Sequence, residues 1–274
     1  MIRFDGRAVL VTGAGRGLGR AYARAFAERG AAVAVHDAGV ERGGEGGDPS
    51  VADAVVAEIR DAGGAAIPSY ENLSSEAGCV AVVERAAAEL GRLDVVVNNA
   101  GLVIYEEIEQ AHRGWEVMRK VQIDAPFHVS RTAFPIMKRQ EYGRLVFTTS
   151  GIAMSAEDTR PGLSAYCAGK MAQFGLMVVF AAEGREHGIL ANAIAPVAAT
   201  RVYTRHAEPG ELEPEQVAPG VLFLSSDECD VTGVVLSAAG GRFGLRSWAR
   251  SEGVDFGRDP VGPEEIAQRW TDLD

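Results

Sequence analysis

Short apolar runs alternate with amphipathic, alanine-rich segments along most of the chain. The runs are dense in Val, Ile, Leu and Ala and short enough for buried strands, whereas the segments between them carry apolar residues at helical spacing. The predicted strands span 8–13, 31–37, 65–70, 93–101, 143–150, 189–196 and 233–241. The predicted helices span 18–30, 50–64, 77–91, 115–140, 164–188 and 216–226.

Continuous apolar strands that alternate with helices are typical of a parallel sheet covered on both faces. We therefore expect an α/β fold with a doubly wound, mostly parallel, seven-stranded sheet of the Rossmann-like kind. No linker divides the chain, which predicts a single domain over 1–274 with a glycine-rich insert at 38–50. The last segment, 242–274, is predicted as a C-terminal extension that packs either on the body or on a partner subunit.

The amino-acid composition argues against several classes of function. The 274 residues include 27 basic and 38 acidic side chains, and the net charge of −11 disfavours nucleic acids and anionic membranes. The longest apolar run, 174–182, is about half of what a membrane span needs. Three widely spaced cysteines do not make a disulfide framework, and the first strand leaves no room for a signal peptide, so we expect a cytoplasmic protein. The five histidines lack metal-ligand spacing, and we predict no metal.

The first strand runs into the sequence TGAGRGLG, residues 12–19, and then into a helix. Strand, glycine-rich turn and helix N-terminus bring backbone N–H groups together where the helix dipole favours an anion such as a pyrophosphate. Glycines also serve ordinary tight turns, so their spacing alone does not decide between the two interpretations. The candidate cofactor-binding residues of this turn are Gly13, Arg16, Gly17, Leu18 and Gly19.

Asp37 ends the second predicted strand, 18 residues after Gly19. A carboxylate there accepts hydrogen bonds from an adenosine ribose diol and repels a 2′-phosphate, which favours NAD over NADP. Two alternatives remain: Asp37 is a turn or cap residue, or Arg16 and Arg42 reach a phosphate. The sequence NNAG, 98–101, closes the fourth strand at the ligand crevice, although such a sequence also makes simple turns.

Tyr166 and Lys170 stand four positions apart in a predicted helix and therefore on one face. A free tyrosine has a pKa of about 10, and a neighbouring ammonium favours its phenolate. Such a phenol exchanges a proton with an alcohol or a carbonyl. Ser150, at the end of the fifth strand, is a candidate to hold the substrate oxygen beside it. A tyrosine and lysine at this spacing also occur on ordinary helix surfaces, which is the structural alternative.

In this order the motifs resemble the short-chain dehydrogenase/reductase family over essentially the whole chain. The resemblance extends to its (3R)-3-hydroxyacyl-CoA dehydrogenase branch, which includes the dehydrogenase domain of peroxisomal multifunctional enzyme type 2 and bacterial relatives. It rests on residues 3–31, the insert after Asp37, EGREHGILANAIAP, EPEQVAPGVLFL and PEEIAQRW. The resemblance implies hydride transfer between NAD(H) and a secondary alcohol or ketone, with a 3-hydroxyacyl thioester as the favoured substrate and a homodimer or homotetramer as the assembly.

The resemblance also implies roles for individual residues. Tyr166 is the general acid/base, and Ser150 holds the substrate oxygen. Lys170 binds the nicotinamide ribose and lowers the pKa of Tyr166. The other implied cofactor contacts are Gly13–Gly19 to the pyrophosphate, Asp37 to the ribose diol, Glu71 and Asn72 to the adenine, and Asn98 to the cofactor's ribose.

The sequence departs from the family pattern at three places. Gln122 stands where many members have an asparagine that supports a proton-relay water. Ser150 lies 16 residues before Tyr166, further than usual, which we interpret as a loop insertion within 156–162; Ser155 is the alternative serine. The pair Glu71–Asn72 replaces the usual adenine-side aspartate.

Segment 197–214 resembles the family's variable substrate lid and contains Arg201, Tyr203, Arg205 and His206, either as contacts to a CoA phosphate or as a solvated loop. Steroid, terpenoid or polyketide-type alcohols are alternative substrates. A non-catalytic NAD-binding protein is the alternative from another functional class.

Overall fold

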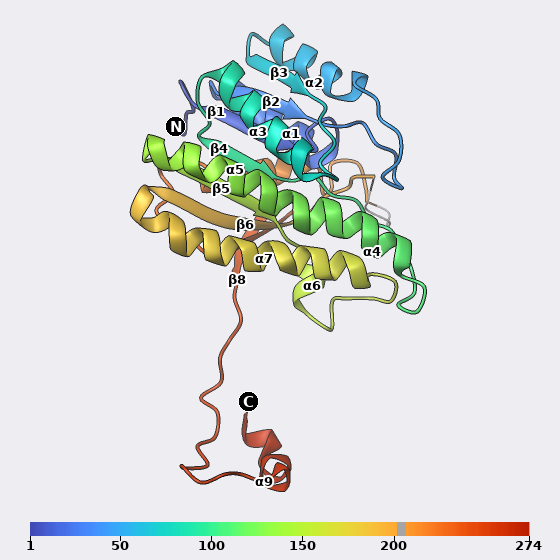
Figure 1. Cartoon of the computed structure of the whole chain (residues 1–274), viewed down its shortest axis with the longest axis vertical. Helices are drawn as coiled ribbons and strands as arrows, with labels where there is room; N and C mark the ends of the chain where they lie inside the picture. The colour runs from blue at the N-terminus through green and yellow to red at the C-terminus, as the bar shows by residue number, and fades with distance from the viewer. Residues whose placement is uncertain (202–206, 274) are drawn as a thin grey trace.

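The computed structural model describes residues 1–201 and 207–273 (Figure 1). Within them, eight strands form one sheet in the order β3-β2-β1-β4-β5-β6-β7-β8. All neighbouring strands are parallel except β7 and β8. The strands are β1 (Ala8–Thr12), β2 (Ala32–His36), β3 (Ala65–Ser69), β4 (Val95–Asn98), β5 (Gly143–Thr148), β6 (Ile189–Val197), β7 (Val235–Ala239) and β8 (Arg242–Arg246).

The α/β fold and the seven parallel strands agree with the sequence prediction, but the strand count of seven is wrong. The eighth strand forms the first part of the predicted C-terminal extension. Gly240 and Gly241 have φ values of +54° and +75°, which allows a tight turn between β7 and β8. The extension therefore leaves the sheet only after Arg246.

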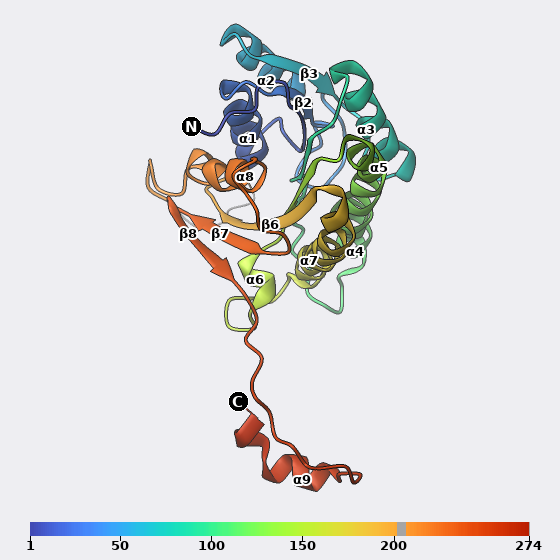
Figure 2. The same ribbon diagram turned by 90° about the vertical axis from the view of Figure 1, so that its left-hand side faces the viewer.

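Helices cover both faces of the sheet (Figure 2). α1, α2 and α8 lie on one face, and α3, α5 and α7 lie on the other. The helices are α1 (Gly17–Glu28), α2 (Ser50–Asp61), α3 (Glu76–Leu90), α4 (His112–Arg119), α5 (Ala125–Gln140), α6 (Gly151–Met154), α7 (Ser164–Gly184), α8 (Ala218–Leu224) and α9 (Pro263–Gln268).

Alternation along the strands fills a separate core on each face. Val9 and Val11 of β1 pack into one cluster, whereas Leu10 between them packs into the other. Each strand residue points to the face opposite its neighbours, so a strand covered on both sides must be apolar throughout. All five residues of β1 are buried, as the continuous apolar run predicts.

The helix predicted over 115–140 begins earlier and is not uniform. A π-helical turn, Lys120–Asp124, separates α4 from α5. Pro126 lies in the first turn of α5 and has no N–H to donate, and in a regular helix its ring would meet the carbonyl group of Gln122. The wider turn accommodates the proline and places Gln122 inside the protein, where it is fully buried.

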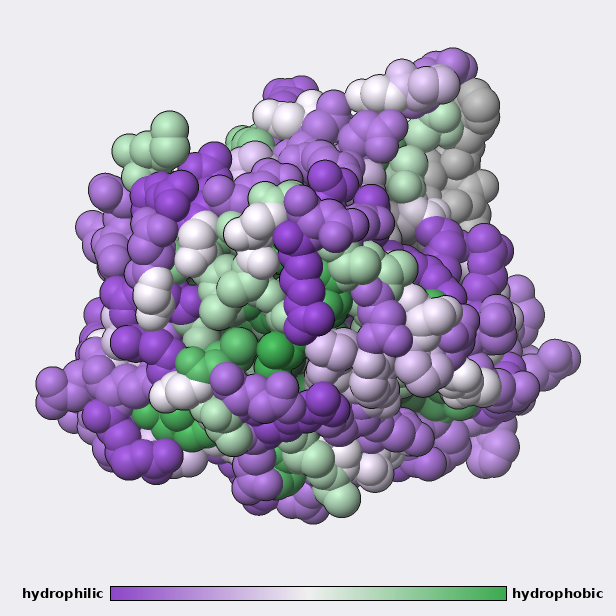
Figure 3. All heavy atoms as spheres, turned by 90° about the horizontal axis from the view of Figure 1, so that it is seen from above, coloured by the Kyte–Doolittle hydropathy of each residue, from purple (hydrophilic) through white to green (hydrophobic). Residues whose placement is uncertain are grey.

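Helix α7 carries the candidate Tyr166–Lys170 pair along β5 and β6. By length and composition alone, the 24 residues from Ser164 to His187 would also suit a membrane-spanning helix. The core helix of a sheet protein has the same properties, and α7 buries the polar side chains of Lys170 and Gln173 against β5. Seen from the end opposite the C-terminal segment, the molecular surface is mostly hydrophilic, with apolar residues gathered near its centre (Figure 3).

The segment after β8 extends away from the body and ends in α9 and a short 3₁₀ helix (Figures 1 and 2). Trp248, near its beginning, contacts Phe174 of α7 with ring centroids 4.5 Å apart. Further along, the side chain of Trp270 is 68% exposed. The C-terminal extension was predicted to pack either on the body or on a partner subunit. The part of it that contains Trp270 does not pack on the body.

Candidate functional site

A cleft of about 970 Å³ lies at the carboxyl edge of the parallel strands. This edge is where α/β sheets bind their ligands, because the loops that follow the strands converge there. The walls come from the glycine-rich turn, the ends of β2, β4, β5 and β6, the first turns of α7, and β8. The cleft therefore brings most of the predicted motifs together.

The glycine-rich turn is closely packed. Gly13 and Gly17 have positive φ values of +65° and +52°, a conformation that suits glycine. A Cβ on Gly19 would stand 2.1 Å from the carbonyl oxygen of Gly13, so this position has no space for a side chain. The N-terminus of α1 has no side-chain cap and therefore presents its free N–H groups at the cleft, which Arg16, Gly17 and Leu18 also line.

Asp37 lies at the same end of the cleft. Its two carboxylate oxygens accept hydrogen bonds from the backbone N–H groups of Gly15 (2.9 Å) and Gly39 (2.8 Å). Both bonds hold the carboxylate in place, and each oxygen keeps a lone pair for a further donor. The arrangement fits a ribose diol, as the sequence predicted.

Two arginines converge beside this carboxylate. Arg16 Nη1 and Arg201 Nη1 both donate to the backbone oxygen of Val40, at 3.4 and 3.1 Å. Burial, followed by the positive charge of Arg16, lowers the pKa of Arg201. The adjacent Thr200 approaches Gly17, where a Cβ would lie 3.0 Å from the threonine methyl group. Arg201 was predicted in a substrate lid, and its position beside the glycine-rich turn was not expected from the sequence.

Two residues predicted to contact the cofactor, Asn98 and Glu71, do not line the cleft. The side chain of Asn98 points away from the cleft and donates to Ser130 Oγ of α5 at 2.9 Å. The next residue, Asn99, lines the cleft instead and donates to the backbone oxygens of Thr12 and Gly13. Successive residues of a strand face opposite sides, and the sequence did not show which of the two asparagines faces the ligand.

Glu71 is the second residue that does not reach the cleft as predicted. Its carboxylate accepts a hydrogen bond from Ser69 and lies 3.5 Å from Arg85 Nη1, so it is engaged outside the cleft. Asn72 does line the cleft, as predicted. Its Oδ1 also accepts from the backbone N–H of Ser74 at 2.9 Å, which fixes the amide.

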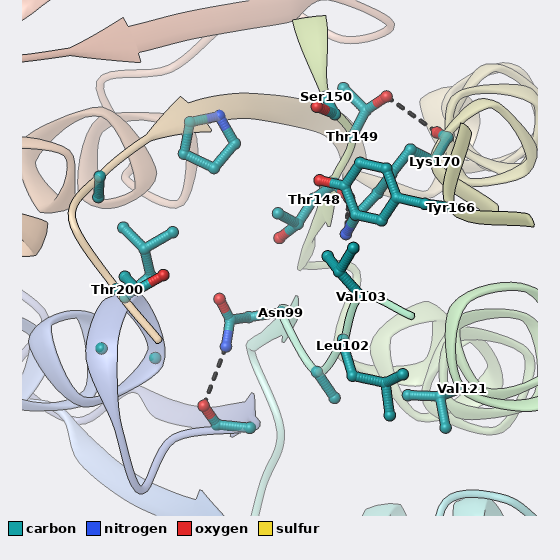
Figure 4. A pocket seen from close by; sticks show the side chains of 18 of the residues that line it. Asn99, Leu102, Val103, Val121, Thr148, Thr149, Ser150, Tyr166, Lys170 and Thr200 are labelled. Atoms are coloured by element: carbon teal, nitrogen blue, oxygen red, sulfur yellow. Dashed lines mark hydrogen bonds between the residues drawn. The ribbon is translucent and has the colours of Figure 1, made fainter. Parts of the chain in front are cut away.

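The three candidate catalytic residues meet at the other end of the cleft (Figure 4). Ser150, directly after β5, and Tyr166 of α7 line the same part of the cleft, and the polar side chain of Ser150 acts to lower the pKa of the tyrosine. Lys170 is buried, and its Nζ donates to the backbone oxygen of Thr148 at 2.8 Å. Thr149 Oγ1 in turn donates to the Lys170 carbonyl oxygen at 2.9 Å, so β5 and α7 are joined at the site.

The electrostatics of the tyrosine differ from the prediction. Burial raises the pKa of Tyr166, and the polar side chain of Ser150 only partly opposes this effect. The Lys170 ammonium lies 5.8 Å from the centre of the phenol ring, and burial lowers the pKa of Lys170 to about 8. Burial therefore outweighs any effect of Lys170 on the pKa of Tyr166 in this structure, and stabilisation of the phenolate by Lys170 remains a prediction.

Gln122 lies behind this group. Its Nε2 donates to the Leu102 carbonyl oxygen at 2.8 Å, whereas its buried Oε1 has no hydrogen-bond partner among the described residues. A Cβ on Gly169 would lie 2.9 Å from Gln122 Cβ, so the glutamine packs directly against α7. The glutamine thus occupies the expected region, with one oxygen left for a further donor.

The alternative serine, Ser155, is not at the site. It follows α6, and its Oγ accepts from the backbone N–H of Glu157 at 3.2 Å. Of the proposed lid, Tyr203, Arg205 and His206 lie outside the described residues. In residues 1–201 and 207–273, no group of three or more His, Cys, Asp or Glu side chains is placed to hold a metal ion.

The residues present fit a nicotinamide dinucleotide. The N–H groups at the start of α1 have no side-chain cap, Asp37 keeps acceptor capacity, and Thr148 Oγ1 at the cleft has no partner in the described part of the chain. Gly13, Gly17, Gly19, Asp37 and Asn72 would hold the adenosine diphosphate half, and Tyr166 and Lys170 lie where the nicotinamide half would end.

Comparisons with known proteins agree with this geometry. Residues 7–209 match the family model described as short chain dehydrogenase. The peroxisomal multifunctional enzyme type 2 of Mus musculus is 41% identical over 276 residues, which cover 98% of this chain and 37% of the mouse protein. The chain thus spans little more than a third of that relative.

Two solved structures are similar over most of the chain. A short chain dehydrogenase from Mycobacterium avium superimposes with a TM-score of 0.86 and 36% identity, covering 98% of this chain and 95% of that one. A 7α-hydroxysteroid dehydrogenase complexed with NADH and 7-oxo glycochenodeoxycholic acid has a TM-score of 0.78 and 28% identity, covering 87% and 95%. The chain therefore belongs to the short-chain dehydrogenase/reductase family.

Proposed function

We propose that this oxidoreductase interconverts a secondary alcohol and a ketone with NAD(H), and that Tyr166 moves the proton. The observation that carries the proposal is that Ser150, Tyr166 and the buried Lys170 line the same cleft as the glycine-rich turn. A bound nicotinamide supplies the hydride donor or acceptor. The chain's own residues orient the substrate oxygen and handle its proton.

In the reduction direction the phenolic O–H of Tyr166 donates its proton to the ketone oxygen as that oxygen gains negative charge. The raised pKa of Tyr166 keeps the phenol protonated near neutral pH, which suits this direction. Ser150 donates a second hydrogen bond to the same oxygen. In the oxidation direction the phenolate accepts the alcohol proton, and the Lys170 ammonium, which remains charged below a pKa of about 8, stabilises the phenolate.

The preference for NAD over NADP rests on Asp37. Its carboxylate is fixed by Gly15 and Gly39 and repels the 2′-phosphate of NADP. The similarity to a dehydrogenase solved with NADH supports this assignment. Arg16 and Arg201 act in the opposite sense, because two guanidinium groups near the carboxylate attract a phosphate.

A 3-hydroxyacyl thioester is the proposed substrate. The support is the similarity to multifunctional enzyme type 2, which the chain matches over 98% of its own length. A steroid-type alcohol is the second candidate, favoured by the fold similarity to the hydroxysteroid dehydrogenase.

The experiment is a screen for NADH formation with 3-hydroxyacyl-CoAs, hydroxysteroids and simple secondary alcohols, repeated with NADP. We expect turnover with NAD to be highest for a 3-hydroxyacyl-CoA and at least tenfold lower with NADP, since one close charge repulsion is worth about 1.4 kcal/mol or more. Equal rates with the two cofactors would contradict the assignment of Asp37. Turnover of steroids alone would replace the proposed substrate class.

We also propose that the protein is a homo-oligomer in which the segment after β8 contacts a second copy. Trp248 and Trp270 are 53% and 68% exposed on a segment that leaves the body, and large exposed apolar side chains mark interaction surfaces. Light scattering is expected to give twice or four times the 29.0 kDa mass of one chain. A monomeric mass at micromolar concentration would refute this proposal.

A further inference from the structure

The unpredicted strand β8 brings arginines to the wall of the cleft. Side chains alternate along a strand, so Arg242, Gly244 and Arg246 share one face and Phe243 lies on the other. Phe243 faces α8, because a Cβ on Gly220 would lie 2.9 Å from the phenyl ring. The arginine face is therefore turned to the opposite side, toward α6, which lies beside the end of β8 in Figure 2. Arg242, Gly244 and Arg246 all line the cleft, as does Phe243 at its border with α8.

Arg246 reaches the backbone beside the candidate active site. A Cβ on Gly151 would stand 2.9 Å from both Cζ and Nη2 of Arg246, so the guanidinium fills the space that a side chain at this position would take. Gly151 directly follows Ser150, and consecutive Cα atoms are about 3.8 Å apart. The guanidinium thus lies next to the residue that holds the substrate oxygen.

The charge of Arg246 is only partly compensated. Its Nη1 lies 3.7 Å from Asp158 Oδ2, and both side chains are about half exposed. Asp158 belongs to the lengthened loop between α6 and α7, so this ion pair joins the loop insertion to the unpredicted strand. A guanidinium has five N–H donors, and one loose ion pair leaves several of them available toward the cleft.

We infer that Arg246 binds an acyl oxygen of the substrate, either a thioester carbonyl or a carboxylate oxygen, located one methylene group from the reacting carbon. This inference rests on the proposed function. Ser150 and Tyr166 hold the oxygen of the reacting carbon, and the guanidinium fork donates to the acyl oxygen. Two fixed oxygens orient the substrate, whereas a simple secondary alcohol has only one.

The test compares three substrates in steady-state kinetics of the full chain: a 3-hydroxyacyl N-acetylcysteamine thioester, the corresponding 3-hydroxy acid, and a secondary alcohol of equal chain length. The thioester carries no phosphate group, unlike a CoA thioester, so an effect of Arg246 on its kinetics cannot come from binding of a phosphate. Arg246→Gln is expected to lower kcat/KM for the acyl substrates about 10- to 100-fold, as for a lost hydrogen bond from a charged group. For the secondary alcohol, kcat/KM should change less than about threefold. For the acyl substrates, Arg246→Lys should retain part of the kcat/KM that Arg246→Gln loses.

A second variant moves the guanidinium without removing it. The Cβ of Gly151→Ala must displace the end of Arg246, so this variant should show the same selective loss with the thioester. The double variant Gly151→Ala/Arg246→Gln should be no worse than Arg246→Gln alone, because both changes remove one interaction. Arg131→Gln is the matched control, since Arg131 is 52% exposed, pairs with Glu76 at 2.7 Å and does not line the cleft.

Each outcome is decisive. A selective loss with the acyl substrates supports the inference, and the acyl substrate that shows it identifies the oxygen's source. Equal losses with acyl substrate and alcohol, or independent effects of the two substitutions on the thioester, overturn it while leaving the proposed function intact. If the unmodified protein turns over neither acyl substrate with NAD(H), the proposed substrate class fails and the inference fails with it.

Discussion

Tyr166→Phe is expected to lower kcat for the preferred substrate about 10²–10⁴-fold, the usual contribution of a positioned general acid or base. The substitution removes only the phenolic oxygen, which is the atom proposed to exchange the proton. The packing of α7 and the glycine-rich turn should be unaffected. NADH binding, measured by fluorescence titration, should therefore change little while turnover is lost.

The pH dependence provides a second measurement of the same change. Because the pKa of Tyr166 is raised, the phenolate fraction grows as pH increases through the neutral and alkaline range, so alcohol oxidation should accelerate with pH. The Phe variant should lose this dependence. Tyr70→Phe is the control, since Tyr70 does not line the cleft and hydrogen-bonds with Asp53. A Tyr166→Phe protein with full activity would disprove the assigned role.

Gly19→Ala is expected to abolish cofactor binding, with a loss of affinity of more than about 100-fold, or roughly 2.7 kcal/mol. The new Cβ would lie 2.1 Å from the Gly13 oxygen and 2.6 Å from Asn99 Nδ2. A backbone contact this short cannot be relieved by a rotamer change, so the turn or α1 must shift. Isothermal titration with NADH measures the loss, and the thermal midpoint should also fall, because overpacking costs about 1–3 kcal/mol.

Gly175→Ala is the control for this substitution. Gly175 lies in α7, its φ is not in the left-handed region, and a Cβ there would meet no atom within 4 Å. Alanine is more favourable than glycine in a helix by up to about 1 kcal/mol, so this variant should bind NADH normally and melt slightly higher. Unchanged NADH affinity in Gly19→Ala would show that the turn does not contact the cofactor.

The sequence predicted most of the fold because the relevant information is local. Buried parallel strands must be apolar on both faces, so β1 and β4 are recognisable as continuous runs. Even β3 was found, although it contains Pro68, because its other residues and its boundaries are typical of a strand. The pair Tyr166–Lys170 was also accessible, because a helix fixes the relation between residues four positions apart.

The sequence missed β8 although a signal was present. Phe243 and Leu245 alternate with Arg242, Gly244 and Arg246, and two glycines precede the run, which is typical of a hairpin. Because the run has only two apolar residues, it resembles a loop until a partner strand is known. Its role in the cleft, and with it the position of Arg246 beside Gly151, depends on that pairing.

The sequence by itself thus determined the fold class, the family motifs and the cofactor turn, because each is encoded in the spacing of neighbouring residues. Only the tertiary structure decided which asparagine faces the cleft, that Glu71 pairs elsewhere, that Arg201 joins Arg16 at Val40, and that burial raises the pKa of Tyr166. These features depend on side-chain direction, burial and contacts between segments far apart in the chain, and such quantities exist only once the chain has folded.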